Sequence, residues 1–117
     1  MNPDFTKYIQ DILDSIKLIE YHLTEIKSFS DYASNFTVID AVERRLAIIG
    51  EALWKASKLN KNILVTNQNK IIGLRHILVH DYDLMDDASI WKIVQSNLKI
   101  LKEEIQKYLD LKWISKQ

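Results

Sequence analysis

The chain contains no cysteine, a single proline and two glycines among its 117 residues. Without cysteine it can form neither a disulfide framework nor a thiolate metal site. Proline and glycine are the residues that most often interrupt helices, and 47% of the residues are hydrophobic. We therefore expect a mostly α-helical protein, and a single domain over residues 1–117, because that length suffices for one hydrophobic core.

Neither sign of charge is in excess, because 16 Lys and Arg residues balance 16 Asp and Glu residues. Such a chain has no overall attraction for nucleic acid, so any nucleic-acid contact must come from a local patch. Neither a charged-then-apolar leader nor a long uncharged apolar run is visible in the sequence. We expect a cytoplasmic protein without a membrane partner.

Apolar residues recur at three- and four-residue steps in four stretches, as in amphipathic helices. The first helix opens at Asn2-Pro3, with Asn2 as the N-cap, and its stripe reaches Ile26. A polar connection over residues 28–35 follows. Thr37 and Asp40 approximate a capping box, so the second helix is predicted to begin there. Its apolar stripe comprises Ile39, Val42, Leu46, Ile49, Leu53 and Ala56.

The last two helices follow a loop over residues 58–66 that should press onto the core. The third helix is predicted from residue 66 or 67 to about residue 80, with Ile77 and Leu78 in its apolar stripe. After a turn over residues 81–86, Asp86 or Asp87 can cap the fourth helix, which should fray after residue 113. The predicted fold class is all-α, an up-down four-helix bundle with one additional short helix possible.

Gly50 lies in the middle of the second predicted helix. Glycine there costs about 1 kcal/mol relative to alanine, which suggests close approach by another backbone or by a ligand. Gly50 and the adjacent Glu51 could mark a helix-crossing contact, or they could support a functional site.

The densest group of functional side chains is Arg75-His76-Ile77-Leu78-Val79-His80-Asp81-Tyr82, in which an apolar triplet suited to a core separates the polar residues. On a continuous helix Arg75 and His80 lie about 140° apart. They converge only if the helix loosens at His80 or if a second subunit supplies the partner, as a two-fold axis beside this helix would. In such a cleft Arg75 could bind a phosphate and His80 could transfer a proton. Those groups suffice for attack of a ribose 2′-hydroxyl on the adjacent phosphate without a metal.

Simpler explanations exist for two of these residues. Arg75 could cap helix carbonyls or pair with Asp81 or Asp83, and Tyr82 could be a packed aromatic residue with its hydroxyl at the surface.

Metal binding is a further alternative for this segment. His76 and His80 are four residues apart and could share a helix face, as two zinc ligands do. Two ligands are too few, and no recognised spacing places a third, so we expect no metal site. The nearby acidic residues lack the spacing and glycine of a calcium loop and are interpreted as turn and capping residues: Asp81, Asp83, Asp86 and Asp87.

Arg75, His80 and Tyr82 together resemble the Arg-x4-His-x-Tyr signature of the HEPN superfamily, in particular the HepT-like toxins. The run Glu43-Arg44-Arg45-Leu46, followed by Ile49-Gly50-Glu51-Ala52, is similar to that family's second recurrent block. Trp91 lies where the last helix of the family often starts. The resemblance therefore covers nearly the whole chain.

This resemblance implies a helical homodimer in which Arg75 and His80 of both subunits are the catalytic residues of a metal-independent ribonuclease that needs no cofactor. His76, Asp81 and Glu51 are the residues expected to support the site. The resemblance also implies a type VII toxin–antitoxin pair, in which a minimal nucleotidyltransferase (MNT) antitoxin attaches adenylate to Tyr82. A bulky anionic group on Tyr82 would compete with an RNA phosphate for Arg75.

Two alternatives to a ribonuclease remain open at the level of sequence. The chain could be a non-catalytic HEPN binding or scaffold subunit that partners a nucleotidyltransferase, because the same fold serves in both ways. It could also be a plain structural dimer.

Overall fold

The computed structural model describes residues 2–80 and 85–115, with side chains described up to residue 111. In these ranges the chain is helical and contains no strand. The elements are α1 (Pro3–His22), α2 (Phe29–Ala33), α3 (Phe36–Leu59), α4 (Gln68–His80), α5 (Asp87–Lys92), the π-helical segment η2 (Ile93–Asn97) and α6 (Leu98–Ser115).

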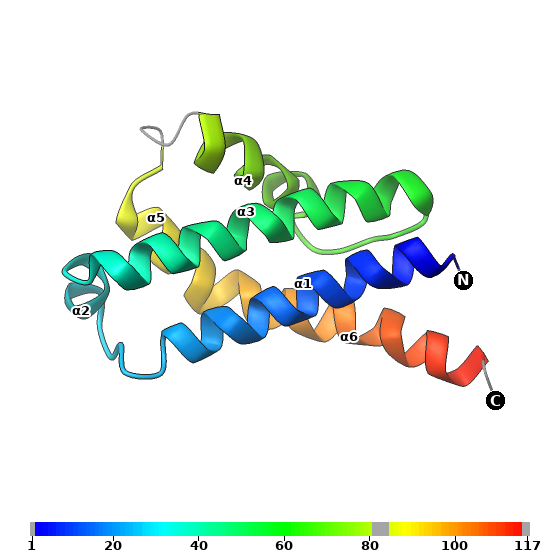
Figure 1. Ribbon diagram of the computed structural model, residues 1–117, viewed down its shortest axis with the longest axis horizontal. Coiled ribbons are helices and arrows are strands. Elements are labelled where there is room, and N and C mark those ends of the chain that lie inside the picture. The colour runs from blue at the N-terminus through cyan, green and yellow to red at the C-terminus, as the bar shows by residue number, and fades with distance from the viewer. Residues whose placement is uncertain (1, 81–84, 116–117) are drawn as a thin grey trace.

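The long helices alternate in direction along the molecule (Figure 1). α1 and α3 run antiparallel and form the most extensive contact, α6 packs against α1, and α4 packs mainly on α3. α5, η2 and α6 follow one another without a break and together correspond to the predicted fourth helix. The short helix α2 lies between α1 and α3 in the chain. The predicted all-α bundle with one short extra helix is confirmed.

Most residues of the predicted apolar stripes form the core. Every residue of the stripe predicted for the second helix is at most 8% exposed. Burying one such side chain contributes roughly 1.5–3 kcal/mol relative to leaving it in water. The loop before α4 also presses onto the core, because Ile63 and Val65 are buried, whereas Leu64 between them is 79% exposed.

The start of α1 agrees with the prediction, but its end and the connection that follows it do not. Asn2 caps α1 as predicted, accepting hydrogen bonds from the backbone N–H groups of Asp4 and Phe5, but α1 ends at His22 rather than near Ile26. The polar connection contains α2, whose N-cap is Ser28.

The start predicted for α3 is wrong. Asn35 is the N-cap, because its Oδ1 accepts a hydrogen bond from the Val38 N–H at 3.1 Å. Helical backbone therefore already begins at Phe36, and Thr37 lies inside the first turn, where it cannot act as a cap.

We expect Asn35→Ala to lower the free energy of unfolding by about 1 kcal/mol, because it removes the acceptor for an otherwise unpaired N–H. Thr37→Ala is the matched control and should change the free energy of unfolding by less than about 0.5 kcal/mol. Urea denaturation of both variants checks this. A larger loss for Thr37→Ala than for Asn35→Ala would contradict the assigned start of α3.

The fourth helix contains a π-helical segment that the sequence reading did not predict. The segment begins at Ile93, and Leu98 follows its last residue. Both residues are buried, although they are five residues apart. In a regular α-helix a five-residue step turns a side chain about 140° away from the core. The i→i+5 bonding of η2 absorbs the extra residue, so the stripe continues through Leu101 and Ile105.

Candidate functional site

α4 carries the group of functional side chains on the outside of the bundle. Because α4 packs mainly on α3, only Ile71 and Leu74 along it are buried. Ile77 and Leu78 are half-buried, and Val79 is 46% exposed. Leu78 packs against the core as predicted. The prediction that the whole apolar triplet belongs in the core is wrong for Val79, since a helix that packs mainly on one neighbour buries one narrow stripe.

Gly50 sets the distance between α3 and α4. A Cβ at this position would lie 2.8 Å from the backbone oxygen of Ile71 and 3.1 Å from the backbone nitrogen of Arg75. The predicted close approach is thus confirmed, and the approaching group is the α4 backbone. The crossing places Arg75 opposite Glu51, the residue that follows Gly50.

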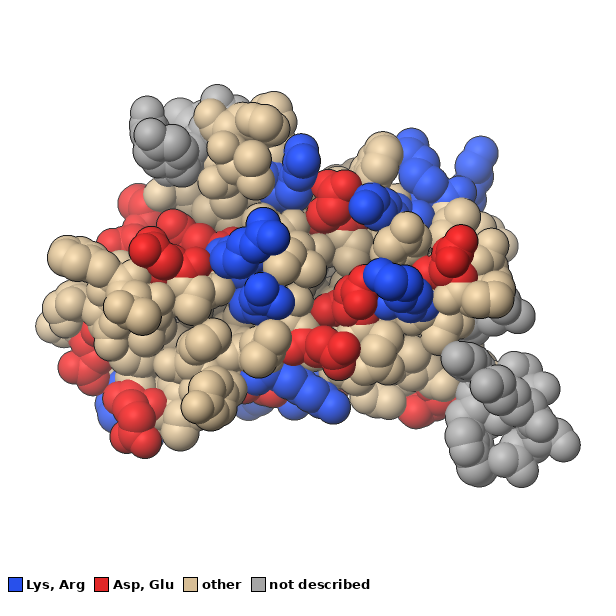
Figure 2. Space-filling model, viewed as in Figure 1, with Lys and Arg blue, Asp and Glu red and all other residues tan. Residues whose placement is uncertain are grey.

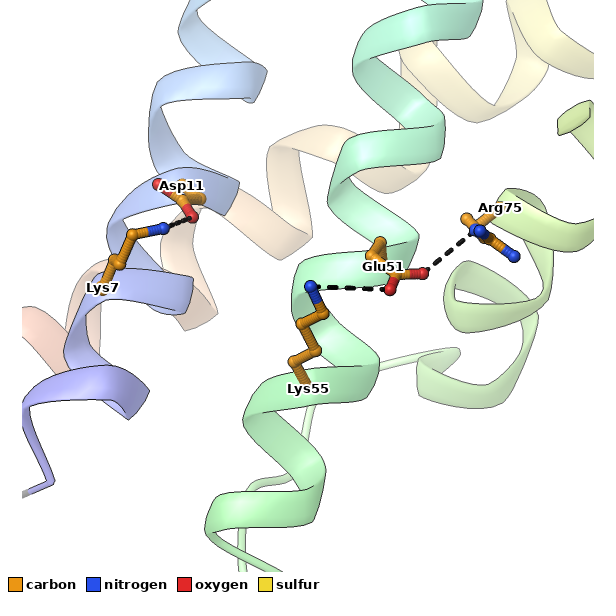
Figure 3. Close-up of polar contacts among 5 residues, drawn as sticks. All are labelled: Lys7, Asp11, Glu51, Lys55 and Arg75. Atoms are coloured by element: carbon orange, nitrogen blue, oxygen red, sulfur yellow. Dashed lines mark hydrogen bonds and ion pairs between the residues drawn. The ribbon is translucent and has the colours of Figure 1, made fainter.

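Glu51 links two cations from different helices (Figure 3). Its carboxylate lies 3.1 Å from Arg75 Nε and 3.7 Å from Lys55 Nζ. Both members of the Arg75–Glu51 pair are more than one third exposed, so the pair contributes at most about 1 kcal/mol to stability. The contact places the Arg75 guanidinium beside Glu51.

The two histidines of α4 lie together, as their four-residue spacing predicts. The rings of His76 and His80 have centroids 5.2 Å apart, and both residues are exposed. Within the described part of the chain, no three His, Cys, Asp or Glu side chains form a group that could hold a metal ion.

Arg75 and His80 are not brought together within one chain. α4 is regular up to His80, so the loosening considered above does not occur by that point and the two side chains remain about 140° apart around the helix. Asp81, Asp83 and Tyr82 lie outside the described residues.

Two hollows flank the Arg75–Glu51 contact, and both of these side chains line each hollow. The first, called the α1 cleft here, has a volume of about 410 Å³ and lies where α1, α3 and α4 meet. The second, called the His76 hollow, has a volume of about 360 Å³. Its lining comprises Gly50, Glu51, Trp54, Ile72, Arg75 and His76.

The α1 cleft contains side chains to which the sequence assigned no role in the site, although Arg44 belongs to the run that resembles the family's second block. They are the cations Lys7, Arg44 and Lys55, the aromatic residue Tyr8 and the carboxylate of Asp11. Figure 3 shows the Lys7–Asp11 pair on α1 beside the Glu51–Lys55 pair on α3. The four-residue spacing of each pair is visible in the sequence, but their proximity depends on how α1 packs against α3.

Charges of both signs are interspersed on this face of the molecule (Figure 2). Within the described residues, Arg44 forms no salt bridge, whereas Lys7 pairs with Asp11 at 3.0 Å. The hydrogen bond to Asp11 is the main cause that raises the pKa of the Lys7 ammonium. Four cations and two carboxylates line the cleft, so its lining carries a small excess of positive charge.

None of the helices in the described ranges combines the length and the apolar character needed to cross a bilayer.

Comparison with known proteins shows to which family this helical chain belongs. Residues 12–108 match the family described as "Ribonuclease HepT-like". The chain belongs to this family of HEPN ribonucleases, and the resemblance seen in the sequence is confirmed. No solved structure gives a match.

Individual relatives agree with this assignment. A Methanocaldococcus jannaschii protein named "Putative RNase" is 32% identical over 88% of this chain and 94% of its own length. A Thermococcus cleftensis protein named "Probable ribonuclease HepT" is 32% identical over 86% of this chain and 91% of its own. A second M. jannaschii protein, named "Gamma-glutamylcyclotransferase and putative RNase", is 33% identical over 94% of this chain. The chain spans 50% of the length of that relative.

Proposed function

We propose that this protein is a metal-independent endoribonuclease that acts as a homodimer in the cytoplasm, with Arg75 and His80 of both subunits lining one catalytic cleft. The observation that carries the proposal is the exposure of Arg75 and His80 on α4 in a chain of a ribonuclease family. Exposed side chains of these types are available to a substrate.

The packing of α4 supports the dimer. Ile77 and Leu78 are half-buried and Val79 is 46% exposed, so the last turns of α4 offer an apolar surface between the functional residues. A second copy related by a two-fold axis would cover this surface with its own α4. The same contact would bring the Arg75 of one subunit near the His80 of the other, which one chain alone does not do.

The proposed chemistry uses only side chains and the RNA itself. His80 of one subunit accepts the proton of a ribose 2′-hydroxyl, and the 2′-oxygen attacks the adjacent phosphorus. Arg75 stabilises the charge that develops on the phosphoryl oxygens. The bond from phosphorus to the 5′-oxygen breaks, and that oxygen takes a proton from His80 of the second subunit. The products are a 2′,3′-cyclic phosphate and a 5′-hydroxyl.

Three residues would support the catalytic pair. Glu51 fixes the guanidinium of Arg75 through its contact with Nε. His76, whose ring lies 5.2 Å from that of His80, limits the orientations open to His80. Asp81 is assigned a supporting role from the family resemblance.

Cleavage without divalent ions is the direct test of this function. We expect purified protein to cut single-stranded RNA equally well with excess EDTA and with Mg²⁺, because the proposed groups replace a metal. Gel analysis should show ends that carry a cyclic phosphate. If EDTA abolished cleavage and Mg²⁺ restored it, the proposed chemistry would be wrong. No cleavage under any condition, together with co-purification with an MNT nucleotidyltransferase, would favour the scaffold alternative.

We further propose that the protein is the toxin of a type VII toxin–antitoxin pair, neutralised by adenylylation of Tyr82. Incubation with the MNT enzyme and ATP should add the mass of one or more adenylates to a peptide that includes Tyr82, and RNA cleavage should fall in parallel. Tyr82→Phe should abolish the mass increase. Unchanged labelling of Tyr82→Phe would place the modification elsewhere.

A further inference from the structure

We propose that the α1 cleft binds the nucleotide next to the cleaved phosphate in single-stranded RNA, with Tyr8 as a stacking platform for a base and Arg44 and Lys55 as phosphate contacts. This inference rests on the proposed ribonuclease function, because it extends the substrate path from Arg75. It assigns a binding role to α1 and to the middle of α3, outside the Arg-x4-His segment.

The position of the cleft connects it with the candidate catalytic group. Arg75 and Val79 of α4 line the cleft together with residues of α1 and α3. If a phosphate of an RNA strand contacts Arg75, the nucleotide on one side of that phosphate can therefore enter the α1 cleft. The volume of about 410 Å³ falls in the range of pockets that hold small organic ligands, which is adequate for a single base and its sugar.

The charge of the cleft fits a polyanion. Four cations line it, Lys7, Arg44, Lys55 and Arg75, against two carboxylates. This leaves an excess of two positive charges in a chain whose total charge is zero. Arg44 is exposed and, in the described residues, has no carboxylate partner. Its guanidinium is the cation that a phosphate can reach without first breaking an ion pair.

Tyr8 adds the feature that distinguishes a nucleic-acid path from a simple anion site. Its half-buried ring lies against the core and also lines the cleft. The ammonium groups of Lys7 and Lys55 lie 5.4 and 5.6 Å from the ring centroid. Because these ammonium groups lie over the ring, a base that stacks on Tyr8 must take the place of one of them, and the displaced lysine can then contact the RNA backbone. A duplex keeps its bases stacked on one another, so it cannot use this platform.

Binding is best measured in a His80→Ala background, in which the proposed cleavage is removed. The probe is a short fluorescent uridine-rich single strand, with a duplex of equal length for comparison. Arg44→Ala should weaken binding of the single strand and lower the slope of log Kd against log salt by about 0.7, the value for one lost phosphate contact. Tyr8→Ala should weaken binding roughly tenfold without changing this slope, and Tyr8→Phe should bind like the background.

Matched controls separate the cleft from general effects of charge and aromatic area. Lys99→Ala removes one exposed cation on α6, and Tyr21→Ala removes a 73% exposed ring from α1; neither residue lines the cleft. Both should bind RNA like the background. Because Arg44 is exposed and Tyr8→Phe keeps the ring, thermal unfolding of these two variants should match the background.

The outcomes distinguish this inference from the proposed function. Unchanged affinity and salt slope in Arg44→Ala, or equal losses in Arg44→Ala and Lys99→Ala, would overturn the cleft assignment even if the parent protein cuts RNA. A parent protein that cuts no RNA would overturn the ribonuclease function. Selective loss of binding in Arg44→Ala and Tyr8→Ala would then still support a single-strand binding cleft.

Discussion

His80→Ala is expected to lower the rate of RNA cleavage by roughly 10²- to 10⁴-fold, the usual contribution of a positioned general acid or base. Arg75→Ala should cause a loss of roughly 10²- to 10³-fold, because charge on the phosphoryl oxygens then develops without its cation. Single-turnover cleavage of labelled RNA in EDTA measures both effects.

Controls for these variants follow from the geometry of α4. Both side chains are exposed, so the free energy of unfolding should change by no more than about 1 kcal/mol, including loss of the Arg75–Glu51 pair. Arg75→Lys retains the charge but not the planar fork and should recover only part of the activity. His22→Ala changes a histidine of α1 that lines neither hollow and should cut RNA normally. Parental rates in both alanine variants would show that catalysis resides elsewhere.

Gly50→Ala is expected to destabilise the protein by about 1–3 kcal/mol, although alanine is intrinsically the better helix former. The added Cβ would lie 2.8 Å from the backbone oxygen of Ile71, so α4 must move away from α3. Because the same Cβ meets the backbone and Cβ of Arg75, the variant should also cut RNA more slowly.

Gly73→Ala is the matched control for this substitution. Gly73 lies within α4, and a Cβ there meets no atom within 4 Å. We expect this variant to be more stable than the parent by about 0.5–1 kcal/mol, through helix propensity alone. Guanidinium denaturation of the two variants should therefore give shifts of opposite sign. Equal stabilisation by both substitutions would mean that α3 and α4 do not cross at Gly50.

The sequence predicted those parts of the fold that depend on local spacing. A stripe of apolar residues at three- and four-residue steps identifies the buried face of a helix, and Asn2 before Pro3 marks a start whatever the rest of the chain does. Gly50 also predicted a close approach correctly, because a glycine in a buried helix face needs a packing reason.

Two kinds of feature could not be predicted from local spacing. They are the choice between two possible cap residues and the features that depend on tertiary packing. Asn35 and Thr37 are both acceptable caps, and the choice between them follows from where the chain leaves α2. The five-residue step from Ile93 to Leu98 is visible in the sequence. It indicates a π-helical segment only if both residues are known to be buried, and the sequence alone does not show that. The partial exposure of Ile77 and Leu78 follows from the position of α4 at the edge of the bundle.

Much of the candidate site is defined by contacts between distant parts of the chain. Arg75 meets Glu51, a carboxylate 24 positions earlier, because the crossing at Gly50 sets the register of α4 on α3. In the same way, Tyr8 and Arg44 approach Arg75 only through the packing of α1 on α3 and of α3 on α4. Local sequence carries no signal for these pairs.

Mixing the Arg75→Ala and His80→Ala variants most directly tests the claim that two subunits build one site. Each variant alone should be inactive. After unfolding and refolding together in equal amounts, roughly half of the dimers would be mixed and would pair an intact Arg75 from one subunit with an intact His80 from the other. These dimers lack the second His80 that protonates the 5′-oxygen, so the mixture should cut RNA faster than either variant alone but at well below a quarter of the parental rate. A mixture that forms dimers yet stays as inactive as its components would contradict a shared catalytic cleft.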